Sequence, residues 1–463
     1  MKNNSVLLKG FLILILMISI VFSGCTKTDV PPADKTQENN NLEVQKQEDS
    51  QKQEISYEKT VSSVNDKDYT LDKVVVLSRH NVRAPLSTKG SDLYRMTPHK
   101  WIDWTSEPSE LSVHGGNLET IMGQYFRKYL AQKQLLLENE IYDENQVRIY
   151  SNSLQRTIAT ARFFAAGLLP VSETDVEYHE EVGKMDPVFN PKLTIDSEAF
   201  KSQVMSELEK MGGDSGLQGI EEKLAPNYKI LEEALDLKDS EIAKQDKYDK
   251  FPTDDLEISL VLDKEPSLKG SLKKATTAAD ALILQYYEDE ALDAPFGKNL
   301  SLEDWKKIGE IKDVYGEVLF AAPSVAVNVA NPLIKEVKSE FENNQRKFTF
   351  LCGHDSNLAS FLAALEVEDY QLPNAVELKT PIGAKLVMEQ WRDSNNKLFV
   401  SFKLVYYSID QFRNLTEINL ENPPEVFDVS FKGMQKNKDG MYKYEDVIER
   451  FNKALEANEK LPR

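Results

Sequence analysis

Cysteine is almost absent from this chain of 463 residues, which contains only Cys25 and Cys352. Histidine is also scarce: the five histidines are widely spaced, and no C-x-x-C or H-E-x-x-H pattern occurs. These absences exclude a scaffold of several disulfides, and we expect neither a metal site nor a cofactor. Cys352 ends a mostly apolar stretch, so we expect its thiol to be buried and unreactive.

Positive charge is in deficit, with 56 Lys and Arg against 76 Asp and Glu and a net charge of −20. That balance argues against nucleic acid as a partner and against broad adhesion to anionic lipid. Hydrophobic residues make up 41% of the chain. A chain of this length can therefore bury a real core, in one large domain or two ordinary ones.

A long apolar run occurs near the N-terminus, from Phe11 to Phe22, interrupted only by Ser19. It is too short to cross a bilayer comfortably and is typical of a signal peptide. The run leads into "VFSGC", which resembles a bacterial lipobox. We predict that residues 1–24 are a lipoprotein signal peptide and that Cys25 is lipidated, which would leave no intrachain disulfide. The alternative is an ordinary signal peptide with an incidental cysteine.

The following segment, residues 25–68, is polar and too poor in apolar residues to fold, so it is predicted to be a disordered tether. Such a protein would be exported and anchored to the bacterial cell envelope through its lipid.

The remaining sequence predicts an α/β fold. Val74–Leu77 is an unbroken apolar run, 147–152 alternates, and 348–354 is another buried strand. Helical patterns over 118–137 and 154–167 lie between the strands, and a late antiparallel pair flanks the turn at 393–396. Residues 192–320 are rich in Glu, Lys, Leu and Ala at helical spacing. We predict an α/β domain built from 69–191 and 321–463, with a helical cap domain over 192–320.

Charged side chains follow three of these strands. In α/β sheets, ligands bind at the carboxyl ends of the strands, so we expect these side chains to converge. Ser151 or Ser153 is a candidate cap for the helix that carries the last arginine. The converging residues are Arg79, His80, Arg83, His354, Asp355 and Arg156.

This set is suited to phosphate chemistry. Three guanidinium groups can bind a phosphate dianion and the charge that develops during its transfer. A neutral imidazole can carry a phosphoryl group, and an Asp can protonate the leaving oxygen. Each residue alone is more often structural. The joint pattern is much stronger, because each element sits at a strand end, and on pattern alone an anion site and a set of structural residues are equally open.

The motifs resemble those of a known family, the histidine acid phosphatases. "SRHNVRAP" resembles their Arg-His-Gly-x-Arg-x-Pro signature, with Asn81 in place of glycine, and "GHDSNLA" resembles their His-Asp motif. "SNSLQRTIATARFF", "KMDPVFNP" and "LQYYE" place the chain near the branch of bacterial periplasmic glucose-1-phosphatases and phytases, closer to the former. The resemblance covers about 74–451.

The resemblance implies roles for the converging residues. His80 matches the nucleophile that becomes phosphohistidine, and Asp355 matches the proton donor. The phosphate-binding set is matched by Arg79, Arg83, Arg156 and His354. The implied fold is a phosphoglycerate-mutase-like α/β sandwich domain with a mostly helical inserted domain. The implied activity is that of an acid phosphatase that needs no metal, and we expect a monomer.

The substrate is less determined by the sequence. Leu86 is apolar where phytases of this group place polar or basic residues, which favours a small sugar phosphate such as glucose 1-phosphate. Glu288, in "LQYYE", is a candidate contact to a sugar hydroxyl, or else a solvated acid at a helix end. The alternatives are a phytase, a non-catalytic surface lipoprotein that binds phosphorylated ligands, and a phosphomutase or fructose-bisphosphatase-like relative.

Overall fold

A computed structural model of the protein describes residues 68–172, 175–288 and 295–463. The predicted signal peptide, Cys25 and all but the last residue of the predicted tether lie outside the described residues. Within these ranges, every helix is too short or too polar to cross a membrane.

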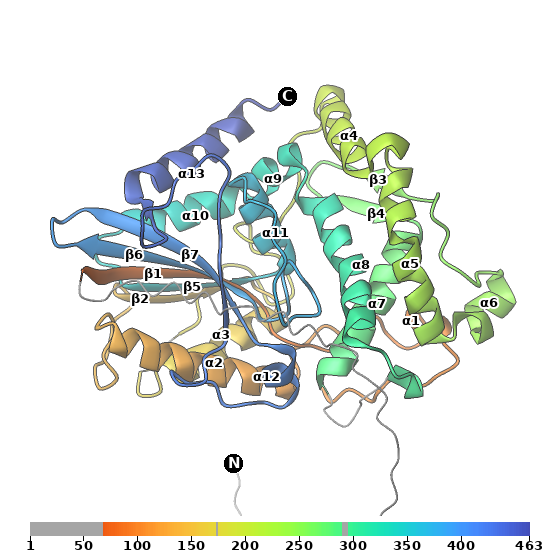
Figure 1. Cartoon of the computed structure of the whole chain (residues 1–463), viewed down its shortest axis with the longest axis horizontal. Coiled ribbons are helices and arrows are strands. Elements are labelled where there is room, and N and C mark those ends of the chain that lie inside the picture. The colour runs from red at the N-terminus through yellow and green to blue at the C-terminus, as the bar shows by residue number, and fades with distance from the viewer. Residues whose placement is uncertain (1–67, 173–174, 289–294) are drawn as a thin grey trace, which may run out of the picture. The chain divides into compact units, whose positions relative to one another are not determined.

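A single large sheet forms the centre of the α/β part, with the strand order β2-β5-β1-β6-β7-β8 and β9 paired with β7 (Figure 1). The first three strands run parallel and the others are antiparallel to their neighbours. The predicted late pair is β6 and β7, joined by the predicted turn. The strands are β1 (Tyr69–Arg79), β2 (Val147–Ser151), β5 (Phe348–Gly353), β6 (Lys385–Asp393), β7 (Leu398–Tyr406), β8 (Glu425–Asp428) and β9 (Tyr442–Lys443).

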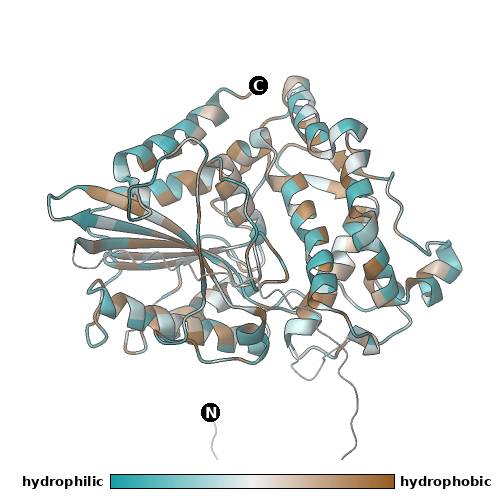
Figure 2. Ribbon diagram, viewed as in Figure 1, coloured by the Kyte–Doolittle hydropathy of each residue, from teal (hydrophilic) through white to brown (hydrophobic). Residues whose placement is uncertain are grey.

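Helices cover both faces of this sheet (Figure 1). Val74 and Val76 of β1 face a core shared with α2 and α3, whereas Val75 and Leu77 face a core shared with α10, α11 and α13. This explains why the apolar run in β1 is unbroken, and the brown residues in Figure 2 gather between these layers. The covering helices are α2 (Val113–Gln132), α3 (Gln155–Leu168), α9 (Pro323–Val329), α10 (Asn331–Glu342), α11 (Asp355–Ala364) and α13 (Tyr444–Glu459).

The segment from Glu198 to Phe320, here called the helical part, consists mainly of helices. It also contains a two-stranded antiparallel sheet, β3 (Glu257–Ser259) and β4 (Ser267–Lys269), which the sequence did not predict. Its main helices are α4 (Glu198–Gly212), α5 (Gln218–Leu235), α6 (Glu241–Asp246), α7 (Ser271–Glu288) and α8 (Leu302–Phe320), and the short helices elsewhere are α1 (Asp92–Arg95) and α12 (Ile409–Arg413).

Two local predictions need correction. The helix predicted over 118–137 is α2, which begins five residues earlier because the Ser112 side chain caps it by accepting a hydrogen bond from the Gly115 amide. The predicted serine cap of α3 is wrong. Its N-cap is Leu154, Ser151 ends β2, and the Ser153 hydroxyl instead accepts a hydrogen bond from the Glu180 amide.

Register brings the ends of the parallel strands together. Arg79 of β1 lies opposite Gly353 of β5, and Ser151 of β2 lies opposite Cys352. The chain therefore leaves all three strands at the same edge of the sheet, where His80, Asn152 and His354 follow. Cys352 is buried, as predicted, and burial raises the pKa of its thiol well above the usual value.

Candidate active site

His80 lies immediately after β1 and is tied to β5 by a hydrogen bond from its amide to the Gly353 carbonyl, 3.0 Å long. Its ring Nδ1 lies 2.8 Å from the carbonyl oxygen of Asn81. Because a carbonyl can only accept, Nδ1 must carry the ring proton and Nε2 keeps a free lone pair. Burial, followed by the charges of Arg156 and Arg83, lowers the pKa of His80 well below its usual value. The ring is therefore neutral, which is the state that attack by an imidazole nitrogen requires.

Asn81 holds the peptide group that orients this ring. Its Oδ1 accepts a hydrogen bond from the Val82 amide at 2.8 Å, and that N–H belongs to the same planar peptide as the Asn81 carbonyl. Its Nδ2 donates to Glu119 at 2.7 Å, and Glu119 pairs with Lys385 at 2.9 Å. All three side chains are fully buried. A glycine at position 81 would supply none of these side-chain bonds.

The second histidine, His354, follows β5 and lies beside the first, with 5.5 Å between the two ring centroids. Its Nε2 is 2.6 Å from Nδ2 of Asn152, the residue that follows β2. Its amide donates to Asn357 in α11. Burial and the charge of Arg156 lower the pKa of His354 well below its usual value, so this ring is also neutral.

Two arginines face the histidines. Arg83 donates from Nη2 to Asp280 of α7 at 3.1 Å. Arg156 is the second residue of α3, and its buried Nε has no hydrogen-bond partner among the described residues. Burial, followed by the charge of Arg83, lowers the pKa of Arg156 to about 10. The guanidinium of Arg156 stays positive at physiological pH, and within the described part of the chain it forms no ion pair with a carboxylate, so it is available to an anion.

Arg79 is only 2% exposed and belongs to a chain of buried ion pairs. Its Nη1 lies 2.8 Å from Glu377, which also pairs with Lys312 of α8 at 2.8 Å. Lys312 lies 2.6 Å from Asp280, the partner of Arg83. Alternating charges therefore connect the end of β1 to α7 and α8.

Asp355 is the first residue of α11, and its side chain is 51% exposed. Its Oδ1 accepts a hydrogen bond from the Ser356 amide at 2.9 Å, and its Oδ2 lies 3.3 Å from Nη2 of Arg79. Partial burial raises the pKa of Asp355, but Arg79 and Lys312 outweigh that effect and hold it below the usual range. Without a bound anion, this carboxyl is therefore ionised.

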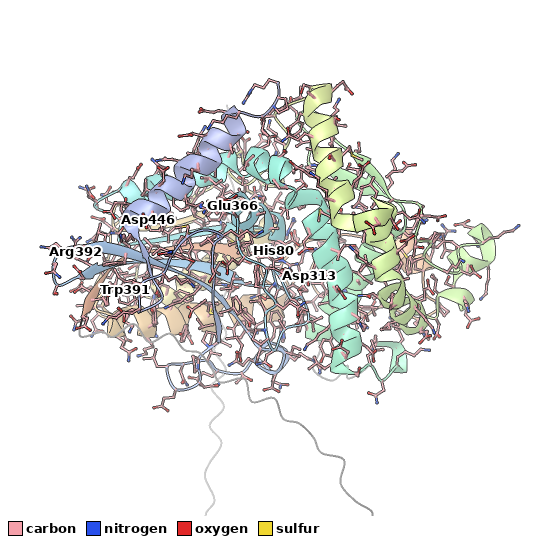
Figure 3. All side chains as sticks on the ribbon, turned by 45° about the horizontal axis from the view of Figure 1, so that its top comes forward. His80, Asp313, Glu366, Trp391, Arg392 and Asp446 are labelled. Carbon is pink, nitrogen blue, oxygen red and sulfur yellow. The ribbon has the colours of Figure 1, made fainter. Side chains whose placement is uncertain are left out.

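These groups open into a cavity of about 820 Å³ between the sheet edge and the helical part. His80, Asp313 and Glu366, labelled in Figure 3, lie on its wall. The predicted residues that line it are His80, Leu86, Arg83, Arg156, His354 and Asp355.

Two predicted residues are placed elsewhere. Arg79 is not on the cavity wall and acts on it through its contacts with Asp355 and Glu377. Glu288 is the last residue of α7 and is also not among the residues that line the cavity. The structure therefore does not bring Glu288 to the site.

Several site residues were missed by sequence reasoning. Asp280, Lys312 and Glu377 fix the arginines, yet each occurs alone in a helix or loop far along the chain and has no motif around it. Asn81 and Asn152 do lie inside the quoted motifs. Their hydrogen bonds were not predicted, because the sequence does not show which partners a side-chain amide will meet in the fold. Among the described residues, no group of three or more His, Cys, Asp or Glu could hold a metal ion.

The fold and the site define a class: an α/β protein with a neutral histidine and clustered arginines at the ends of parallel strands. Residues 70–407 match the family described as the histidine phosphatase superfamily (branch 2), and this chain belongs to it. It is therefore a phosphatase.

Similar proteins extend this assignment over most of the chain. A glucose-1-phosphatase of Providencia rettgeri is 39% identical over 85% of this chain and 94% of its own length. The glucose-1-phosphatase of Salmonella typhimurium is 36% identical over 82% and 92%. The solved structure of the phytase from Citrobacter braakii has a TM-score of 0.75 at 26% identity and covers 84% of this chain and 97% of that one. The predicted fold class is confirmed.

Proposed function

We propose that this protein hydrolyses small sugar phosphates, with glucose 1-phosphate as the representative substrate. The observation that carries the proposal is the cavity itself, whose wall includes His80, Arg83, Arg156 and His354. The two glucose-1-phosphatases to which the chain is similar support the same substrate class.

In the first step, Nε2 of His80 attacks the phosphorus atom and forms an N–P bond. The bond between phosphorus and the ester oxygen breaks, and that oxygen takes a proton from Asp355 as the sugar leaves. Arg83, Arg156 and His354 hold the equatorial oxygens and stabilise their charge. The tautomer imposed by the Asn81 carbonyl keeps the attacking lone pair available.

In the second step, water attacks the phosphohistidine. Asp355 accepts a proton from that water, the N–P bond breaks, and inorganic phosphate leaves with His80 neutral again. The same carboxyl thus serves as acid and then as base, as reversibility requires.

The proton that Asp355 gives up must first arrive, because the carboxyl is ionised in the free site. A phosphate monoester has a second pKa near 6, so below that pH it enters as a monoanion that carries a proton. Once bound, its negative charge offsets Arg79 and raises the pKa of Asp355, so the proton can move to the carboxyl. Because the substrate brings the required proton only when it is a monoanion, activity should be highest at acidic pH.

The rest of the cavity wall favours a neutral leaving group. The lining residues include nine Asp and Glu against six Lys and Arg. Of the lysines, Lys312 and Lys379 already pair with carboxylates. Most of the lining carboxylates are paired as well, so the wall carries little uncompensated charge of either sign. Several further phosphate groups on a substrate would find few unpaired cations there, whereas sugar hydroxyls can bond to the carboxylates. Leu86, 61% exposed at the rim, adds an apolar contact rather than a charge.

A phytase is the second candidate. The size of the cavity supports it, since about 820 Å³ exceeds what one sugar phosphate fills. The similarity to the Citrobacter braakii phytase also supports it.

The location is part of the proposal. We propose that residues 1–24 are removed, that Cys25 is lipidated, and that the enzyme acts outside the cytoplasm while tethered to the cell envelope. Support comes from the apolar run and the lipobox-like sequence. Metabolic labelling with a fatty acid, lost in Cys25→Ser, would test the lipid anchor.

The deciding experiment measures phosphate release by the whole chain, purified in detergent, at mildly acidic pH. Glucose 1-phosphate and phytate are compared, with His80→Ala as the inactive control. We expect a higher kcat/KM on glucose 1-phosphate and no activity in the variant. Preferred turnover of phytate would overturn the substrate assignment and keep the mechanism. A folded wild-type protein that is inactive on both would favour a binding lipoprotein.

A further inference from the structure

Asn152 follows β2 directly, is fully buried and touches the ring of His354. Its Oδ1 accepts hydrogen bonds from the amides of Ser153 and Asp186, both 2.8 Å long. These two bonds decide which way the amide faces, because its oxygen can only accept and its nitrogen can only donate. Nδ2 therefore donates to Nε2 of His354 over 2.6 Å.

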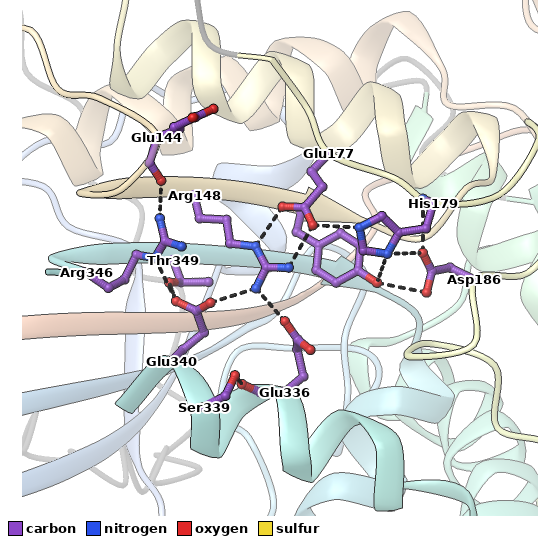
Figure 4. Close-up of polar contacts among 11 residues, drawn as sticks. Glu144, Arg148, Glu177, His179, Asp186, Glu336, Ser339, Glu340, Arg346 and Thr349 are labelled. Carbon is purple, nitrogen blue, oxygen red and sulfur yellow. Dashed lines mark hydrogen bonds and ion pairs between the residues drawn. The ribbon is translucent and has the colours of Figure 1, made fainter. Parts of the chain in front are cut away.

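The Asp186 side of this arrangement is held firmly. Oδ1 of Asp186 accepts from the Tyr150 hydroxyl at 2.8 Å and from the Val188 amide at 3.0 Å. Its Oδ2 accepts from the amide of His179 (Figure 4). Asp186 is 0% exposed, so its own N–H stays directed at Asn152.

Burial, followed by the surrounding positive charges, lowers the pKa of His354 and keeps its ring neutral. Arg156 faces it from α3, Arg79 and Arg83 from the chain around the end of β1, and the neutral ring of His80 from the same segment. Asp355 on α11 acts in the opposite direction and is outweighed. A neutral imidazole has a single ring proton, and the position of that proton decides whether a given nitrogen donates or accepts.

We propose that Asn152 is a positioning residue that sets the tautomer of His354, with the proton on Nδ1, and so keeps the ring a hydrogen-bond donor for the phosphoryl group. The inference rests on the proposed function, which assigns His354 to phosphate binding. An aspartate at position 152 would favour the opposite tautomer of His354. Its second carboxylate oxygen can only accept a hydrogen bond, so Nε2 would have to carry the proton.

The test uses Asn152→Asp, which changes one group and preserves size. The chain has five histidines, so labelling the rings with ¹⁵N gives five sets of NMR signals, and His354→Ala identifies the set from His354. In the wild type at neutral pH, we expect Nε2 of His354 without a proton. In Asn152→Asp, we expect a proton on Nε2 and a pKa of His354 raised by about 1–3 units. The exposed Asn344→Asp is the matched control and should match the wild type.

Activity gives the second readout. In Asn152→Asp, the ring is cationic at low pH and still donates from Nδ1, so turnover and inhibition by inorganic phosphate should persist there. Above the new pKa, the neutral ring keeps its proton on Nε2 and presents a lone pair to phosphate. We expect kcat/KM to fall at least about tenfold there relative to the wild type at the same pH, which corresponds to the loss of one charged hydrogen bond.

The outcomes are separable. A proton on Nε2 in the wild type would overturn the inference even if the variant did not fold. An unchanged His354 tautomer in Asn152→Asp would also overturn it, as would a changed tautomer with an unaltered pH profile. Failure of the wild type to hydrolyse any sugar phosphate would instead overturn the proposed function, and the tautomer would still be measurable.

Discussion

Asp280 gives the sharpest stability prediction, because it is a buried carboxylate between two cations. Its oxygens lie 3.1 Å from Nη2 of Arg83 and 2.6 Å from Nζ of Lys312. Burial raises the pKa of Asp280, but Arg83 and Lys312 outweigh burial and hold it far below the usual range. Asp280→Asn keeps the shape of the side chain and removes its charge.

The expected loss follows from these distances. With an effective dielectric constant of about 20, Coulomb's law gives about 5 kcal/mol for the contact with Arg83 and about 6 kcal/mol for that with Lys312. Desolvation offsets much of this, and breaking a buried pair typically costs about 3–5 kcal/mol. With about 2.1 cal/mol/K of unfolding entropy per residue, the folded part should then lose about 4–6 °C in Tm.

Calorimetry or circular dichroism at pH 5 and pH 7 checks this value. A group with a lowered folded-state pKa stabilises fully above its unfolded pKa, near 4, and loses that effect as the pH falls further. The drop in Tm should therefore be the same at both pH values. The exposed Asp214→Asn, also in the helical part, should leave Tm unchanged. A drop below about 1 °C in Asp280→Asn would refute the claim that the ion-pair chain stabilises the fold.

Three further outcomes are expected. Asp355→Asn should flatten the acidic optimum and lose more activity on glucose 1-phosphate than on p-nitrophenyl phosphate, whose leaving group needs no proton; equal losses would contradict the acid role. Asn81→Gly should lower kcat about tenfold and change KM less than twofold, because the peptide that orients His80 loses its side-chain bonds; a change confined to KM would contradict this. Activity should survive EDTA, because guanidinium groups neutralise the phosphate, and rescue by a divalent ion after loss in EDTA would contradict it.

The sequence predicts the parts of this protein that depend on local pattern. The unbroken run in β1 indicates burial on both faces. The rule that ligands bind at the carboxyl ends of the strands then predicts that His80, Arg156 and His354 cluster, and the register of β1, β2 and β5 brings them together. The helical content of the segment after 192 was likewise evident from spacing.

The rest depends on distant partners. Whether an acid in a helix pairs with Arg83 or faces water depends on how α7 packs. The sequence around Asp280 therefore could not predict this ion pair. The serine cap of α3 was wrong because the hydroxyl of Ser153 found a partner in a loop 27 residues away. Glu288 was placed by motif, and the end of α7 does not reach the cavity.

The chain of ion pairs from Arg79 to Arg83 limits which segments relatives could exchange. Two of its members, Lys312 and Asp280, belong to the helical part, whereas Arg79 ends β1, Arg83 lies just after β1, and Glu377 lies between α11 and β6. A helical part taken from another phosphatase would have to bring one base and one acid at these two places, or leave buried charges unmatched. Any exchange of the helical part must therefore keep a base and an acid at these two positions if Arg83 and Glu377 are to stay paired.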